Sequence, residues 1–91
     1  MPIPRTDLPA ALRGLYAITP DEPDESRLLG MAASALAGGA RVLQFRDKTT
    51  AAGRRQRLAS AMQSLCRQYG ACFIVNDDLA LALRVDADGV H

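Results

Sequence analysis

The run 41–48 places an amide, a guanidinium and an ammonium at one end of an apolar segment, on Gln44, Arg46 and Lys48. Its apolar residues occupy both parities, as in a strand buried on both faces. Because side chains alternate along a strand, Gln44 and Arg46 share a face, and Lys48 follows just beyond the strand. Arginine offers fork-shaped donors to phosphate oxygens and lysine offers a point charge. The run indicates a clamp for a polyanion beside a flat polar ring, with solvated basic residues at a strand end as the alternative.

Further polar residues stand where other strands are expected to end. Asn76 and Asp77 follow an apolar run, and His91 ends the last one. Ligand chemistry in parallel α/β folds lies at the carboxyl ends of strands. Asp77 suits Mg²⁺, which takes one or two protein carboxylates together with substrate phosphates, although a helix N-cap would also satisfy it. Tyr16 on the first strand can face a ligand or pack in the core, and core packing is the default expectation.

The whole chain alternates between strand and helix patterns. We expect strands over 14–19, 41–48, 71–76 and 87–91, separated by helical apolar spacing over 28–37, 58–69 and 79–83. This order predicts an α/β fold with a parallel sheet and right-handed crossovers. Part of a βα barrel and a flavodoxin-like sheet both fit. The glycine fingerprint of a dinucleotide site is absent after the first strand.

The helix ends and the basic residues of the second helix also allow predictions. Asp24 or Ser26 can cap the first helix, Thr49 or Thr50 the second, and Asp77 with Asp78 the third. We expect Arg54, Arg55 and Arg57 to form a solvated helix face rather than an anion site.

Composition narrows the class of protein. The 91 residues are 48% hydrophobic and carry a net charge of +1, which gives no reason to expect a nucleic-acid or membrane partner. Residues 1–7 lack the apolar core of a signal peptide, and residues 1–13 are expected to form a loose arm before the domain at 14–91. Cys66 and Cys72 match no metal or redox spacing and are expected to be buried free thiols. We therefore expect a cytoplasmic protein.

Four segments resemble the successive strand motifs of the thiamine-phosphate synthase family: Leu15–Thr19, Gln44–Lys48, Val75–Asp78 and Ala87–His91. The resemblance covers residues 14–91 and implies the N-terminal half of a TIM-type (β/α)8 barrel. It also implies a transferase of thiamine biosynthesis. That family joins hydroxymethylpyrimidine pyrophosphate to hydroxyethylthiazole phosphate, and pyrophosphate leaves before the thiazole nitrogen attacks.

The resemblance also implies roles for individual residues. Arg46 and Lys48 would be the catalytic residues, and with Asn76 they would hold the pyrophosphate. Gln44 would bind the pyrimidine. Asp77 would ligate Mg²⁺, and the same pocket would be lined by Tyr16 and His91.

The resemblance reaches only four of eight strands, so a second metal-binding carboxylate and the thiazole phosphate site are missing. Half a barrel leaves open strand edges and one uncovered sheet face. We expect little synthase activity from the chain alone, and a need for a homodimer or for a missing C-terminal half. A thiazole tautomerase-like relative and a non-catalytic phosphate-binding remnant stay open as alternatives.

Overall fold

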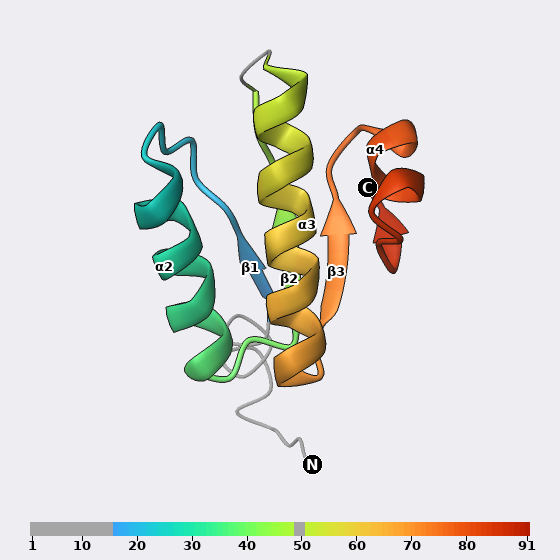
Figure 1. Ribbon diagram of the computed structural model, residues 1–91. Coiled ribbons are helices and arrows are strands. Elements are labelled where there is room, and N and C mark those ends of the chain that lie inside the picture. The colour runs from blue at the N-terminus through green and yellow to red at the C-terminus, as the bar shows by residue number, and fades with distance from the viewer. Residues whose placement is uncertain (1–15, 49–50) are drawn as a thin grey trace.

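Four short strands alternate with helices in the computed structural model, which describes residues 16–48 and 51–91 (Figure 1). The elements are β1 (Tyr16–Ile18), α2 (Glu25–Ala37), β2 (Val42–Phe45), α3 (Ala52–Tyr69), β3 (Cys72–Val75), α4 (Leu79–Arg84) and β4 (Gly89–Val90). The strands and α4 lie within the predicted segments or within one residue of them, whereas α2 and α3 begin three and six residues before the predicted apolar stripes. The predicted arm at 1–13 and the start of the first strand lie outside the described residues.

The strands form one parallel sheet in the order β1-β2-β3-β4. Sequential order is what consecutive βα units of a barrel produce, whereas a flavodoxin-like sheet would place its second strand at the edge. The flavodoxin-like alternative is therefore wrong. In register, Ile18 pairs with Gln44, Gln44 with Ile74, and Ile74 with Gly89.

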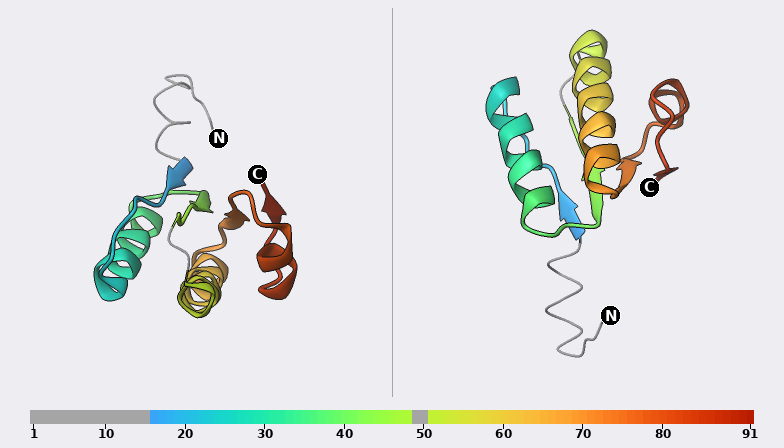
Figure 2. Two further views of the ribbon diagram at one scale, coloured as in Figure 1. Left: turned by 90° about the horizontal axis from the view of Figure 1, so that it is seen from above. Right: turned by 60° about the horizontal axis from the view of Figure 1, so that its bottom comes forward.

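All three described helices cover the same face of this sheet (Figure 2). The strand residues on that face are buried: Leu43, Phe45, Phe73 and Val75 are each at most 1% exposed. They pack against residues of α2 and α3, among them Leu28, Leu36, Leu58 and Met62. The expected alternation along the second strand, which puts Leu43 and Phe45 on the face opposite Gln44, is confirmed, since one parity of β2 and of β3 supplies this core.

The opposite face carries no helix among the described residues, as expected for half a barrel. Tyr16 is 43% exposed and Ile18 is 54% exposed on this face. Cys72 is exposed too, so the prediction of two buried thiols is wrong for it and confirmed only for Cys66. The cause is parity, because Cys72 points away from the helices while Cys66 on α3 points into the core.

The helix ends follow the predictions in part. Asp24 caps α2 by accepting a hydrogen bond from the Arg27 amide at 3.1 Å. The N-cap position of α3 is Ala51, which makes no side-chain cap, while Thr49 and Thr50 lie outside the described residues. None of the described helices is both long and apolar enough to cross a membrane.

Candidate active site

Four polar side chains form a hydrogen-bonded row on the face of the sheet that no described helix covers: Tyr16 at the start of β1, Gln44 within β2, and Asn76 and His91 directly after β3 and β4. Gln44 Nε2 donates to the Tyr16 hydroxyl at 2.5 Å. Asn76 Nδ2 donates to Gln44 Oε1 at 3.1 Å and lies 3.4 Å from His91 Nδ1. Four residues that sequence reasoning singled out separately are thus brought together. Tyr16 does not pack in the core, and that default expectation is wrong.

Gln44 is the centre of the row because both ends of its amide are engaged. It is 4% exposed, and this burial makes each hydrogen bond costly to lose. Gln44 Oε1 accepts and Gln44 Nε2 donates, so the orientation of the amide follows from its neighbours. The second N–H of Gln44 and the hydroxyl proton of Tyr16 then remain available as donors, and the amide oxygen of Asn76 remains as an acceptor. The row can therefore read a polar ring that presents both acceptors and donors.

Arg46 and Lys48 follow β2 directly, and both are exposed. Within the described residues, neither head group makes a hydrogen bond or an ion pair. The backbone of Arg46 is nevertheless fixed, since its amide donates to Thr19 Oγ1 at 2.9 Å and its carbonyl accepts from the same hydroxyl at 3.3 Å. Thr19 is 6% exposed and joins the ends of β1 and β2. The two cations stand on a fixed strand end, with their charges free to meet an anion.

Asp77 has an unusual backbone conformation beside this cluster. Its φ of 59° lies in the left-handed region, which costs a non-glycine residue about 1–2 kcal/mol. The expectation that Asp77 shares in capping α4 is wrong, because the cap is Asp78, whose Oδ1 accepts from the Leu81 amide at 2.9 Å. Within residues 16–48 and 51–91, the Asp77 carboxylate makes no hydrogen bond or ion pair. A strained backbone that holds an unengaged carboxylate is typical of functional positions.

The donor set limits the kind of metal site that this carboxylate can join. In the part of the chain that the structure describes, no three acidic, histidine or cysteine side chains are grouped to hold a metal ion. Asp78 is already engaged, as helix cap and as the ion-pair partner of Arg55. One carboxylate next to two cations fits a Mg²⁺ ion that keeps its waters and shares substrate phosphates, and does not fit a metal held by protein alone.

The solvated face predicted for Arg54, Arg55 and Arg57 of α3 is confirmed for Arg57, whose side chain is 64% exposed, and wrong for Arg54 and Arg55, which are partly buried. Arg54 Nη2 donates to the Glu22 carbonyl at 2.6 Å, and Arg55 Nη2 lies 2.7 Å from Asp78 Oδ2. Arg57 pairs with Glu25 at 2.8 Å, and the hydrogen bond from Arg57 lowers the pKa of the Glu25 carboxyl. The prediction fails for Arg54 and Arg55 because α3 lies between α2 and the α4 cap, so its first turns reach both neighbours.

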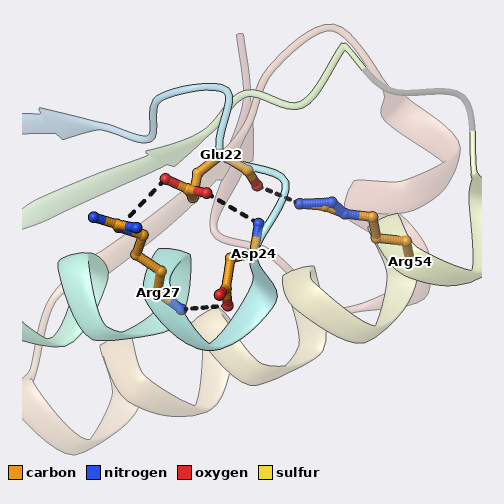
Figure 3. Close-up of polar contacts among 4 residues, drawn as sticks. All are labelled: Glu22, Asp24, Arg27 and Arg54. Atoms are coloured by element: carbon orange, nitrogen blue, oxygen red, sulfur yellow. Dashed lines mark hydrogen bonds and ion pairs between the residues drawn. The ribbon is translucent and has the colours of Figure 1, made fainter.

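The loop between β1 and α2 is held in place by these contacts (Figure 3). Glu22 Oε2 accepts from the Asp24 amide at 3.0 Å, and Glu22 Oε1 lies 3.7 Å from Arg27 Nε. Arg54 reaches the same residue from α3. The loop after β1 is therefore fixed relative to two helices at the end of the sheet where the polar residues gather.

An apolar pocket of about 90 Å³ lies between β1 and α2, away from this polar row. Its lining includes Ile18, Pro20, Leu28 and Met31. None of the polar residues of the row lines it, so it is packing space beside the edge strand.

Known proteins resemble the chain over most of its length. A sequence profile described as thiamine monophosphate synthase matches residues 15–91. The thiamine-phosphate synthase of Chromobacterium violaceum is 61% identical over 84 residues, which are 92% of this chain and 41% of that protein. The thiamine-phosphate synthase of Thioalkalivibrio sulfidiphilus is 55% identical over 87 residues, which are 94% of this chain and 41% of that protein.

A solved structure agrees with these sequences. Thiamine phosphate pyrophosphorylase from Pyrococcus furiosus superposes with a TM-score of 0.74 at 33% identity, covering 88% of this chain and 40% of that one. This match confirms the predicted fold, the N-terminal half of a (β/α)8 barrel. The chain spans about 41% of the length of the curated relatives that it matches. Across that span, the agreement of profile, sequence and fold shows that this chain belongs to the thiamine monophosphate synthase family.

Proposed function

We propose that the chain supplies the pyrimidine pyrophosphate half of an active site that makes thiamine phosphate. The reaction joins hydroxymethylpyrimidine pyrophosphate to hydroxyethylthiazole phosphate and releases pyrophosphate. The observation that carries this proposal is the row from Tyr16 through Gln44 and Asn76 to His91, because it reads a polar ring next to two unpaired cations. The names of the curated relatives, thiamine-phosphate synthase, support the same reaction.

The roles follow from the side chains present. Gln44 and Tyr16 would orient the pyrimidine through their donor hydrogens, while Arg46 and Lys48 would bind the pyrophosphate. As the bond between the pyrimidine methylene carbon and the pyrophosphate oxygen breaks, its electron pair stays with pyrophosphate. Fixed positive charges stabilise that developing charge more in the transition state than in the bound substrate. The thiazole nitrogen then supplies the electron pair that forms the new bond to carbon.

Asp77 and the amide oxygen of Asn76 are the groups that would hold Mg²⁺ next to the pyrophosphate. When bound, Mg²⁺ supplies further neutralisation of the leaving group. The left-handed backbone of Asp77 sets the position of its carboxylate without any side-chain contact in the described part of the chain. We propose that the protein acts in the cytoplasm on these two small molecules, as a homodimer or together with a C-terminal half.

Two other readings share the fold. A thiazole tautomerase-like relative would not need the whole clamp, so the presence of Arg46, Lys48 and Asp77 together favours the synthase. A non-catalytic remnant would bind pyrophosphate without turning substrate over. The remnant is distinguished by activity alone, because its binding properties would be the same.

The test begins with magnesium pyrophosphate binding to the 91-residue chain, measured by calorimetry. We expect saturable binding that Arg46→Ala abolishes. Arg84→Ala is the matched control, since Arg84 lies on α4 and its one side-chain hydrogen bond within the described residues is to the exposed Gln56 at 3.5 Å. An absence of binding by the parent chain would overturn the clamp.

Activity is then measured by mixing the chain with the segment of the Chromobacterium violaceum synthase that it does not match, since the chain is 61% identical to that protein over 41% of its length. Formation of thiamine phosphate from both substrates would support the synthase. Binding without any turnover in this mixture would favour the remnant.

A further inference from the structure

We propose that the ion pair between Arg55 of α3 and Asp78 is a positioning device for Asp77. It holds the backbone of Asp77 in the left-handed conformation and thereby sets where the Asp77 carboxylate stands beside the phosphate clamp. The role of that carboxylate rests on the proposed function; the link between the ion pair and the backbone does not.

The backbone of Asp77 is anchored on the side of the sheet. The amide of the preceding residue, Asn76, donates to the Phe45 carbonyl at 2.9 Å. The amide of Asp77 itself donates to the His91 carbonyl at 2.8 Å, which connects it to the end of β4. These two hydrogen bonds fix the residue from β2 and β4, but they leave the following peptide to be held by something else.

Asp78 holds the peptide that follows Asp77, and its two carboxylate oxygens make different interactions. Oδ1 accepts from the Leu81 amide and caps α4, while Oδ2 lies 2.7 Å from Arg55 Nη2. A cap needs only one oxygen, so the ion pair is an additional restraint. It connects the start of α4 to α3, 23 residues earlier in the chain.

The ion pair stands on a rigid base. Arg55 lies one turn before Leu58 and Ala59, which are 1% and 0% exposed against the sheet. The side chains of Arg55 and Asp78 are 26% and 24% exposed, so water screens this pair less than it screens a surface pair. Together, α3 and the α4 cap hold the peptide after Asp77, while the sheet holds the peptide before it.

The neighbouring ion pair provides the comparison that isolates this effect. Arg57, two residues further along α3, pairs with Glu25 at a similar 2.8 Å, but their side chains are 64% and 39% exposed. Glu25 begins α2 and flanks none of the polar residues at the strand ends. Loss of the Arg57 pair removes the same charge from the same helix without affecting the peptide next to Asp77.

The experiment measures hydrogen exchange of the Asp77 and Leu81 amides by NMR, in the 91-residue chain and in three variants. Asp78→Asn keeps the helix cap, since asparagine caps as well as aspartate, but it removes the charge that Arg55 meets. We expect the Asp77 amide to exchange about tenfold faster in Asp78→Asn and in Arg55→Ala, with Leu81 still protected in Asp78→Asn. Arg57→Ala should change neither amide.

Magnesium-dependent pyrophosphate binding is measured on the same proteins and on a fourth variant, Arg55→Lys. Residues that hold a metal ligand in position typically contribute tenfold or more to metal affinity. Arg55→Ala should therefore raise the Mg²⁺ concentration needed for pyrophosphate binding about tenfold. Arg55→Lys should restore part of it, because lysine keeps the charge but not the fork. If the Arg55–Asp78 ion pair were purely structural, Arg55→Ala and Arg57→Ala would change the magnesium dependence of binding to the same extent.

The two measurements separate the inference from the proposed function. If the Asp77 amide exchanges in Arg55→Ala and Asp78→Asn as it does in the parent, the positioning role is overturned, whatever the binding data show. If exchange accelerates as expected while the parent binds no magnesium pyrophosphate, the positioning role stands and the proposed function fails.

Discussion

Alkylation of the two cysteines tests which face of the sheet is covered. Cys66 lies on α3 with 0% exposure, and burial raises the pKa of its thiol to about 11. Cys72 is exposed on the face that no described helix covers. Since the thiolate is the form that reacts with iodoacetamide, burial protects Cys66 both by limiting access and by suppressing ionisation.

The size of the difference follows from these pKa values. At about pH 8, a thiol with a pKa of about 11 is about 0.1% ionised, whereas a thiol with an ordinary pKa of 9.0 is about 10% ionised. Ionisation alone therefore slows Cys66 about 100-fold relative to an ordinary thiol. Its closed environment slows it further, because reaction then needs local opening of α3.

The assay follows peptide masses over time in native protein, with protein in denaturing urea as the control in which both thiols react. We expect Cys72 to be modified at least 100-fold faster than Cys66 in the native chain. Equal rates in the native chain would refute the packing of α3 on the sheet. Protection of both thiols would refute the open face, and would show that a second copy or another segment covers it.

Three further predictions follow. Because the folded pKa of Cys66 is raised above its unfolded value, the free energy of unfolding should fall as pH rises from about 9 to about 11, by up to ~3 kcal/mol, in urea titrations over that range; a flat profile would contradict the burial of this thiol. In the complete enzyme, Arg46→Ala should slow pyrophosphate release at least about 100-fold in rapid-quench assays with the unfolding curve unchanged, and an unimpaired rate would remove Arg46 from the clamp. Asp77→Asn should raise the Mg²⁺ concentration needed for half-maximal activity while stability is kept, since asparagine tolerates the left-handed region; an unchanged requirement would end the metal role.

The parts of the fold that depend on local pattern are predictable from the sequence. The two-residue period of a strand predicts that Leu43 and Phe45 share one face, and the order of strands and helices predicts a parallel sheet. The site residues at the strand ends follow from the same reasoning, because parallel strands end at a common edge. Gln44 and Asn76 come together for this reason, although 32 residues separate them.

The failures arise where the outcome depends on tertiary placement. Tyr69 continues the apolar stripe of α3 but is 46% exposed, because it lies in the last turn of the helix, beyond its buried positions. Cys72 belongs to an apolar strand whose second face has no cover among the described residues. The contacts of Arg55 and Thr19 depend on the distance between elements, which no local pattern encodes. A hydroxyl directly after β1 is a weak signal that could have indicated Thr19.

The register of the sheet explains why the polar row exists and how it runs. Tyr16 pairs with Val42, whereas Gln44 pairs with Ile74. The row therefore shifts by two residues toward the carboxyl ends of the strands between β1 and β2. Between β2 and β3 the row shifts by two residues again, to Asn76, which continues the register beyond the last pair of β2 and β3. Two residues of strand advance the row by about 6.6 Å, and this stagger is the one that strands of a barrel require.

Because the row runs diagonally across the strands, it would orient a bound ligand along that diagonal. The ring contacts offered by Tyr16 and Gln44 lie within the strands, whereas Arg46, which is suited to phosphate, and Asp77, which would hold Mg²⁺, follow the ends of β2 and β3. A slip of β3 by one residue would turn the side chain of Asn76 to the helix face and interrupt the row. The buried residues Phe73 and Val75, each at most 1% exposed, oppose that slip, because the same shift would move them out of the core. The core that stabilises the fold thus also fixes the order in which the site can meet a ring and its pyrophosphate.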